Sequence, residues 1–255
     1  KKHQMTCKVL LIFLVLLALS LARWKPLPVG TTWQWQLQGT INTSVNVDMY
    51  DIDMFSNDAS LIKELHEKGR YVVCYIDVGS WENWRPDAST FPESVKGKDN
   101  GWPGEKWLDI RNIEVLGPIM EKRFDMAVAK NCDGIEPDNI DGYTNPSGFP
   151  LTYADQLKYN IWLTEQVHKR NMSIGLKNDN DQVKDLVSHF DWCLNEQCFQ
   201  YNECNTYDPF IVQGKAVFEC EYSENTSKFC PEAKKNKFSG IKKKLSLDSW
   251  VEFCN

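Results

Sequence analysis

The chain has 255 residues, which is enough for one large α/β domain or for two small ones. A hydrophobic content of 42% is that of a globular protein with a sizeable core. The formal net charge of −6 argues against nucleic acid as a partner, because nucleic-acid affinity comes from Lys and Arg that neutralise phosphates, and it weakly favours a neutral or cationic ligand.

Residues 1–22 have the layout of a secretory signal peptide. A basic start is followed by the apolar run VLLIFLVLLALSLA, and Ser20 and Ala22 are small residues at the −3 and −1 positions of a cleavage site. The alternative is a membrane anchor, but the run has about 14 residues and a helix needs about 20 to span a bilayer. We therefore expect a secreted domain, residues 23–255, that has no membrane association after cleavage.

The cysteine content agrees with secretion. Eight of the nine cysteines follow the predicted signal peptide, and an even number in a secreted chain implies disulfides. Their connectivity stays open, although Cys198 and Cys204 are close enough in sequence to close one loop. A metal site is disfavoured, since no C-x-x-C pair occurs and the His residues are scattered. Three N-x-S sequons also fit a secreted glycoprotein: Asn42, Asn171 and Asn225.

Short apolar runs alternate with amphipathic stretches along the rest of the chain. Residues 31–39 alternate apolar and polar side chains up to a glycine, which predicts a strand, and residues 46–51 predict a second one. An Asp cap, apolar residues three and four apart and a final Gly predict a helix over 58–69. The continuous apolar run at 70–80 predicts a strand buried on both faces.

The later elements continue this alternation. Residues 81–109, rich in Trp, Pro and Gly, are expected to form a long loop. Further helices are predicted at 116–131, 152–171 and 180–190, and further strands at 132–138, 172–179, 191–198, 215–222 and 238–244. About eight strands separated mostly by helices favour a single (β/α)8 TIM barrel. The alternative, an open doubly wound sheet, is disfavoured because no G-x-G-x-x-G follows the first strand.

Polar and aromatic side chains gather where these strands end. In chain order they are Asp48, Asp51, Tyr75, Asp77, Trp81, Glu82, Glu136, Asp138, Asn139, Lys177, Asn178, Asp179, Asn195, Glu196, Glu219 and Glu221. A single acid at a strand end is usually a helix cap or a member of an ion pair. Acids at six strand ends indicate a site instead, because chemistry in a (β/α)8 barrel collects at the carboxyl ends of the strands.

Two carboxylates that flank a glycosidic bond are the apparatus of glycoside hydrolysis. One is ionised and attacks the anomeric carbon or steers a water, whereas the other is protonated and helps the leaving oxygen depart. Asp138 and Glu196 end alternate strands of the predicted barrel, so they can face each other across its mouth.

Aromatic side chains provide surfaces on which sugar rings can stack. They fall on the early strands or in the 81–109 loop: Trp33, Trp35, Tyr50, Tyr75, Trp81, Trp84, Trp102 and Trp107. For Trp33 and Trp35, packing in the core is as good an explanation as stacking on a sugar. For the tryptophans of the polar 81–109 loop, core packing is the weaker explanation.

The stretches YVVCYIDVGSWENWRPD, CDGIEPDNIDGY, IGLKND and LNEQCFQYNEC resemble glycoside hydrolase family 114, the endo-α-1,4-polygalactosaminidases, over about residues 30–254. The resemblance implies a TIM barrel that cleaves α-1,4-linked galactosamine polymers. It makes Asp138 the nucleophile of a retaining reaction and Glu196 the general acid/base. It also places Asp77, Lys177 and Asn178 in the pocket, and we assign no catalytic role to Asp77.

Galactosamine polymers are cationic where they are not acetylated, so an acidic rim would attract them. The residues expected to bind substrate are Asp48, Tyr75, Asp77, Trp81, Glu82, Glu136, Asn139, Asp141, Lys177, Asn178 and Glu219. Asp51 and Asp179 are further candidates for contacts to amines, and Lys177 is a candidate for keeping an acid ionised. Asp133 is expected to be structural.

Two other functions remain open from the sequence. One is a glycosidase for another α-galactoside, since a fold does not fix a substrate. The other is a catalytically silent, secreted carbohydrate-binding barrel. A retaining glycosidase needs no cofactor and no metal, and we expect none here. We also expect the protein to be a monomer.

Overall fold

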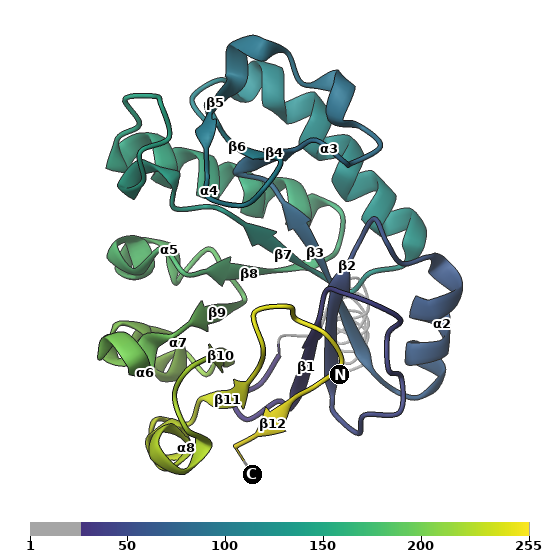
Figure 1. Ribbon diagram of the computed structural model, residues 1–255, viewed down its shortest axis with the longest axis vertical. Helices are drawn as coiled ribbons and strands as arrows, with labels where there is room; N and C mark the ends of the chain where they lie inside the picture. Colours follow the sequence, from purple (N-terminus) through teal and green to yellow (C-terminus); the bar gives the residue numbers. More distant parts are fainter. Residues whose placement is uncertain (1–26, 255) are drawn as a thin grey trace, which may run out of the picture.

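The computed structural model describes residues 27–254, and the expected signal peptide at residues 1–22 lies outside them. Eight parallel strands curl into one sheet, as Figure 1 shows. In sheet order they are β1 (Trp33–Gln36), β2 (Met49–Asp53), β3 (Tyr71–Asp77), β7 (Gly134–Asp138), β8 (Ser173–Lys177), β9 (Trp192–Glu196), β10 (Val217–Glu221) and β11 (Ser239–Lys242). A ninth strand, β12 (Glu252–Phe253), pairs antiparallel with β11. The predicted (β/α)8 fold is confirmed.

Side chain and loop contacts join the two ends of this sheet. The indole Nε1 of Trp33 in β1 donates to the carbonyl oxygen of Ser239 in β11 at 2.7 Å. Beyond the strands, the N–H of Leu37 donates to the carbonyl of Leu247 at 3.0 Å. The segment that follows β11 therefore covers the seam and becomes one wall of the barrel mouth.

The helices lie on the outside of the sheet (Figure 1). They are α2 (Ala59–Glu67), α3 (Ile113–Lys130), α4 (Tyr153–Lys169), α5 (Val183–Leu186), α6 (Cys198–Tyr201), α7 (Asp208–Val212) and α8 (Thr226–Asn236). Asp58 caps α2 as predicted, and Thr152 and Asp155 form a capping box at the start of α4. No helix within residues 27–254 is long and apolar enough to cross a membrane.

The expectation of an irregular loop at 81–109 is wrong in part. This segment and the end of the preceding stretch form a small antiparallel sheet of β4 (Ser80–Glu82), β6 (Glu105–Leu108) and β5 (Lys96–Asp99). The short 3-10 helices η1 (Ala88–Thr90) and η2 (Glu93–Val95) lie between β4 and β5. The strands have three or four residues each and few apolar side chains, so they lack the alternation by which a strand is recognised.

The apolar core has two parts. Trp33, Trp35 and Met49 belong to the cluster that fills the barrel, while a larger cluster lies between the strands and the helices. Trp33 and Trp35 are each 1% exposed, so core packing accounts for both, although Trp35 also reaches the site described below.

Six of the eight cysteines beyond the predicted signal form disulfides: Cys74–Cys132, Cys198–Cys204 and Cys230–Cys254. The Cys198–Cys204 bridge closes the short loop that the spacing of these two cysteines allows. Cys193 and Cys220 remain buried thiols on neighbouring strands. The side chain of Cys193 belongs to the outer cluster and that of Cys220 to the barrel interior, so the two point to opposite faces of the sheet.

Candidate active site

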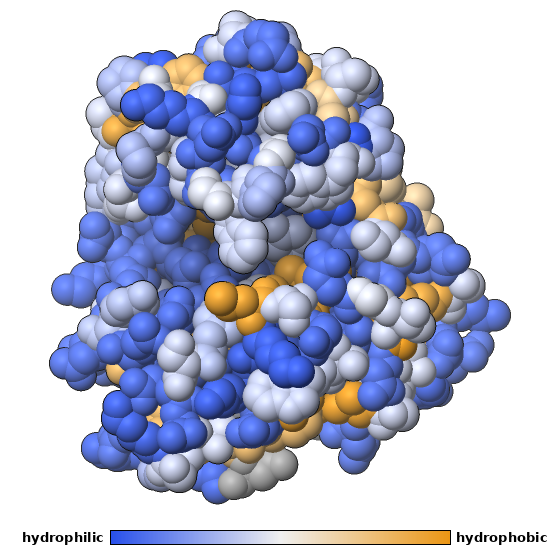
Figure 2. Space-filling model, in the orientation of Figure 1, coloured by the Kyte–Doolittle hydropathy of each residue, from blue (hydrophilic) through white to orange (hydrophobic). Residues whose placement is uncertain are grey.

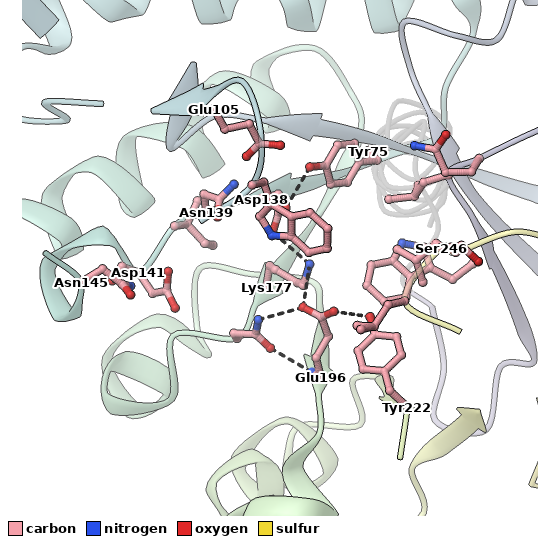
Figure 3. Close-up of a pocket in the computed structure, with 18 of the residues that line it drawn as sticks. Tyr75, Glu105, Asp138, Asn139, Asp141, Asn145, Lys177, Glu196, Tyr222 and Ser246 are labelled. Atoms are coloured by element: carbon pink, nitrogen blue, oxygen red, sulfur yellow. Dashed lines mark hydrogen bonds and ion pairs between the residues drawn. The ribbon is translucent and has the colours of Figure 1, made fainter. Parts of the chain in front are cut away.

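A cavity of about 360 Å³ opens at the carboxyl ends of the barrel strands. Figure 2 shows this face of the molecule hollowed at mid-height, with hydrophilic side chains along much of the hollow and hydrophobic ones at its lower edge. One wall comes from the β4–β6–β5 sheet through Trp102, Glu105 and Trp107. The opposite wall comes from Tyr222 and the segment 245–247 after β11. The floor carries side chains from β3, β7, β8 and β9 (Figure 3).

Lys177, at the end of β8, is the centre of the floor. Its ammonium Nζ lies 2.9 Å from Asp138 Oδ1, 3.3 Å from Glu196 Oε2 and 3.1 Å from Glu136 Oε1. Its side chain is only 4% exposed. Burial alone would lower the pKa of Lys177, but the three carboxylates outweigh burial and raise it well above its usual value. Lys177 is therefore a permanent cation between the two predicted catalytic acids.

Asp138 ends β7 and accepts hydrogen bonds on both carboxylate oxygens. Lys177 donates to Oδ1 at 2.9 Å, and the hydroxyl of Tyr75 donates to Oδ2 at 2.9 Å. Burial would raise the pKa of Asp138, but the charge and hydrogen bond of Lys177, the Tyr75 hydroxyl and the backbone N–H of Asn139 together hold it below the usual range. Asp138 is thus ionised at neutral pH, as an attacking carboxylate must be.

Glu196 ends β9 and is the more exposed of the pair, at 26% of its side chain. The hydroxyl of Tyr222 donates to its Oε1, and the amide of Asn178 donates to Oε2 at 3.3 Å. The same Asn178 side chain accepts the backbone N–H of Glu196 at 2.9 Å. Asn178 has φ +48°, a left-handed conformation that Asn tolerates better than most residues. It therefore fixes Glu196 at both the backbone and the carboxylate.

The two acids are close together. Asp138 Oδ1 and Glu196 Oε2 both contact the same Nζ atom, so they lie at most about 6 Å apart, the two contact distances laid end to end. Carboxyl groups are about 5–5.5 Å apart in retaining glycosidases and about 6.5–9.5 Å apart in inverting ones. The bound applies to these two oxygens, and it lies below the range of inverting enzymes and just above that of retaining ones.

Glu136 lies below Lys177 and is fully buried. It accepts from the indole of Trp35 at 3.0 Å and from Lys177 at 3.1 Å. Burial is the largest influence on it and raises its pKa to about 6, against the lowering effect of Lys177. Glu136 thus holds the cation from beneath and does not face the cavity.

The β7–α4 loop carries Asn139 and Asp141 into the cavity lining. Asn139 donates to Asp77 at 2.9 Å and has φ +60°. The turn is tight, since a Cβ on Gly79 would lie 1.6 Å from the carbonyl oxygen of Asn139, so only glycine fits there. Burial and the charge of Asp138 raise the pKa of Asp141 to about 6.

The structure brings together Tyr75, Asp138, Asn139, Asp141, Lys177, Asn178 and Glu196 around the cavity, with Glu136 directly below. Other predicted binding residues lie elsewhere. Asp48 precedes β2 instead of ending it, and it accepts from the backbone and hydroxyl of Thr32 at the amino end of the barrel. The predicted strand was placed about three residues too early, which put this acid at the wrong end.

Asp77, Trp81 and Glu82 support the turn after β3 and do not line the cavity. Asp77 accepts from the backbone N–H groups at Gly79 and Ser80. The Trp81 indole donates to the carbonyl of Ala88 at 2.9 Å, and its ring contacts the ammonium of Lys96.

Glu82 is buried in an ion pair with Arg85, which also binds Asp53. Asp51 lies under the floor of the cavity, and Asp179 accepts from Asn160 at 2.9 Å beside a neighbouring hollow. These two residues are therefore also absent from the lining of the main cavity.

Glu219 is the predicted binding residue that lies farthest from expectation. It is fully buried on the outer face of β10, where a Cβ on Gly240 would come within 3.3 Å of its Oε2. Its neighbour two positions on, Glu221, accepts the backbone N–H groups of Phe199 and Gln200 at the start of α6. Glu221 therefore supports the α6 segment from behind, whereas neither carboxylate oxygen of Glu219 has a hydrogen-bond partner among residues 27–254. Both side chains face the helices because they stand at alternate positions of the strand.

Several lining residues were not predicted as site residues, among them Glu105, Tyr222 and the segment 245–247. Glu105 was hidden in the expected loop, and segment 245–247 follows the last predicted strand without any pattern of its own. Tyr222 directly follows β10, so a strand-end position was the one available signal.

One group of acids within residues 27–254 converges closely enough to hold a metal ion, namely Asp77, Glu82 and Glu105. Arg85 already donates to Glu82, Ser80 to Asp77 and Asn100 to Glu105. Each of the three acids therefore already accepts a hydrogen bond from the protein on at least one carboxylate oxygen.

Comparison with known proteins identifies the family. The family model described as glycoside-hydrolase family GH114 matches residues 17–255. The chain belongs to glycoside hydrolase family GH114. It is therefore a glycoside hydrolase, and the predicted family and class of enzyme are confirmed. No curated protein sequence matches this chain.

Two solved structures resemble this chain. The crystal structure of Aspergillus fumigatus Ega3 in complex with galactosamine is 45% identical, with a TM-score of 0.86 over 90% of this chain and 97% of that one. The glycoside hydrolase domain of PelA from Pseudomonas aeruginosa is 11% identical, with a TM-score of 0.70 over 89% of this chain and 98% of that one. The second likeness shows the shared fold alone.

Proposed function

We propose that this GH114 chain is a secreted, endo-acting hydrolase of α-1,4-linked galactosamine-containing polysaccharide that works with retention of configuration. Asp138 is the nucleophile and Glu196 the general acid/base. The observation that carries the proposal is the contact of both acids with one buried ammonium, which limits their separation to about 6 Å.

In the first step, Asp138 attacks the anomeric carbon while Glu196 gives its proton to the departing glycosidic oxygen. The glycosidic bond breaks, and an ester forms between the sugar and Asp138. In the second step, Glu196 takes a proton from a water that attacks the same carbon, and Asp138 leaves as a carboxylate. Lys177 and Tyr75 stabilise the ionised Asp138 before the first step and after the second.

The character of the cavity supports an amino sugar as substrate. Among the described residues that line it, four are acids, Glu105, Asp138, Asp141 and Glu196, and one is a cation, the nearly buried Lys177. Aromatic side chains, including Trp102 and Trp107, lie on the wall opposite Tyr222. An anionic cleft attracts ammonium groups, and its aromatic walls can stack on sugar rings. Ega3, which is 45% identical, was crystallised with galactosamine.

Secretion is supported by three disulfides and by the signal-like sequence of residues 1–22. The three sequon residues Asn42, Asn171 and Asn225 are exposed, as glycosylation requires. We propose that the mature enzyme acts as a monomer outside the cell.

The test is digestion of a partly deacetylated α-1,4-galactosaminogalactan, with oligosaccharide products read by mass spectrometry. The wild-type protein should release short oligosaccharides, and Asp138→Asn and Glu196→Gln should release none. A fully acetylated polymer and a neutral α-galactan serve as controls for substrate class. Cleavage of the neutral polymer alone would transfer the activity to another α-galactoside, and binding without cleavage would support a carbohydrate-binding barrel.

A further inference from the structure

Asp51, in the middle of β2, is an unusual acid. It is fully buried, and its neighbours in the sheet are the apolar interior residues Trp35 and Val73. Among residues 27–254, no N–H or hydroxyl group donates to either of its carboxylate oxygens. Trp35, its neighbour on β1, donates to Glu136, so the carboxyl group of Glu136 lies close to that of Asp51 and acts on its pKa. An ionised carboxylate in such a place would carry the full cost of burial without compensation.

Glu136 differs from Asp51 in its partners. It has two donors, the indole of Trp35 on Oε2 and the ammonium of Lys177 on Oε1. It can therefore be ionised at low cost, while Asp51 cannot. Two carboxyl groups in contact also cannot both be ionised easily, because like charges repel strongly in a buried site.

The charges of the whole cluster point the same way. Asp51 and the three acids around Lys177 would carry four negative charges against one positive charge if all were ionised. The titratable groups that face Asp51 are Glu136 and Asp138 from β7 and Lys177 from β8. The proposed mechanism already places one proton on Glu196 before the first step, which leaves Asp51, Glu136 and Asp138 with three negative charges against one positive charge if all three are ionised. A second proton removes part of this excess, and Asp51 is the acid of the cluster that has no hydrogen-bond donor among residues 27–254.

We propose that Asp51 is held as a neutral carboxylic acid that donates its proton to Glu136, and that this pair anchors Lys177 beneath the reacting acids. This inference rests on the proposed function and deepens it, because it gives Asp51 the role of a positioning residue. Burial, followed by the charge of Glu136, raises the pKa of Asp51 well above its usual value, which agrees with the geometry.

The anchor has a use during turnover. When Asp138 forms its ester with the sugar, it loses the negative charge that held one side of Lys177. Glu136 keeps its charge, because the proton from Asp51 and the N–H of Trp35 stabilise the carboxylate. Lys177 therefore stays in place near Glu196 while the ester is hydrolysed.

The first test is infrared spectroscopy of the folded protein at neutral pH, which detects the carbonyl stretch of a protonated carboxyl group. Asp51→Asn should remove one such band. Asp58→Asn is the matched control, since Asp58 caps α2 at the surface, hydrogen bonds from Ser60 and Leu61 lower its pKa, and Asn also caps a helix. Loss of no band in Asp51→Asn, or loss of the same band in the control, would overturn the proposal. The experiment needs no substrate, so its outcome is independent of the proposed activity.

The second test uses the polymer hydrolysis assay. Asn at position 51 keeps a neutral donor, so Asp51→Asn should retain kcat within about threefold and the wild-type pH profile. Asp51→Leu removes the donor and should lower kcat about 10-fold at unchanged KM. Because Glu136 protonates more easily without this donor, the acid limb of the pH profile should move to higher pH than in the wild type. An Asp51→Asn variant as impaired as Asp51→Leu would mean that Asp51 works as an anion and would contradict the proposal. If Asp51→Leu fails to fold, the Asn variant alone decides.

Discussion

Removal of the ammonium group of Lys177 is the most informative perturbation of the site. Lys177→Met keeps the length and the apolar stem of the side chain but removes the cation that lies 2.9 Å from Asp138. At that separation, two unit charges attract by about 6 kcal/mol at an effective dielectric constant of about 20. Burial of the ammonium offsets part of this, and a carboxyl beside one cation is usually shifted by about 1–3 pKa units, or about 1.4–4 kcal/mol.

The sign of the expected change follows from the role of Asp138. The nucleophile must be ionised, so activity falls with falling pH as Asp138 protonates. Loss of Lys177 raises the pKa of Asp138, and the acid limb of the kcat/KM profile should therefore move up by about 1–3 pH units. The assay measures polymer hydrolysis in stopped reactions from about pH 3 to about pH 9, a window that includes the ordinary pKa values of carboxyl groups.

A surface lysine provides the matched control for this experiment. Lys63 has a side chain that is 78% exposed on α2, and Lys63→Met should leave the profile unchanged. An acid limb that stays in place in Lys177→Met, with activity reduced at all pH values alike, would refute the argument that Lys177 sets the ionisation of Asp138.

Three further changes have defined outcomes. Arg85→Met leaves the buried carboxylates of Asp53 and Glu82 without their cation. It should lower the free energy of unfolding, measured by urea denaturation, by about 3–5 kcal/mol. A loss below about 1 kcal/mol would contradict an ion pair between Arg85 and these two acids. Trp102→Ala should raise KM about fivefold at constant kcat, because stacking on an exposed ring at the cavity contributes about 1 kcal/mol to substrate binding. Trp84 is similarly exposed but does not line the cavity, so Trp84→Ala should leave KM unchanged. Equal effects of the two substitutions would refute a stacking role for Trp102. Glu219→Gln should be more stable than the wild type at pH 8 but not at pH 4. Burial and the charge of Glu221 raise the pKa of Glu219 above its unfolded value of about 4.5. The protonated carboxyl group is therefore compatible with the fold at low pH, and its ionisation costs an increasing amount of stability as the pH rises. Equal differences in urea stability at the two pH values would contradict that reading.

The barrel and its two central acids could be predicted because several independent signals agreed. Continuous apolar strands, helices with caps and polar residues after each strand led to a (β/α)8 fold with Asp138 and Glu196 at its mouth. The positions of Asn139, Lys177 and Asn178 followed from the same rule, since each lies at or just after the end of a barrel strand. Tyr75 lies two residues before the end of β3, and Asp141 lies three residues after the end of β7.

The failures have physical reasons as well. Asp48 was misplaced because β2 begins at Met49, about three residues after the predicted start, so Asp48 precedes the strand and lies at its amino end. Glu219 was misplaced because successive residues of a strand point to opposite faces, so an acid one position out of phase faces the helices. Glu105 was missed because the β4–β6–β5 sheet forms by pairing of short polar segments, which leaves no periodic pattern in the sequence.

The buried acids illustrate a different limit. Residues 132–143 contain four acids within twelve positions, but the role of each acid depends on its partners from other strands. Asp133 accepts from His66 and from the backbone of Val72 at the amino end of the barrel, which confirms its structural role. Glu136 faces Lys177 from below, and Asp138 faces the cavity.

The central claim is that Asp138 forms a covalent bond to the sugar, and trapping that bond tests it most directly. Glu196→Gln should still react with an α-galactosaminyl fluoride, whose leaving group needs no acid, but should hydrolyse the ester slowly because it lacks the base. Peptide mass spectrometry should then find one sugar attached to the peptide that contains Asp138, on Asp138 itself. An adduct on Glu136 or elsewhere, or turnover of the fluoride by the wild type with no adduct in the variant, would contradict the account.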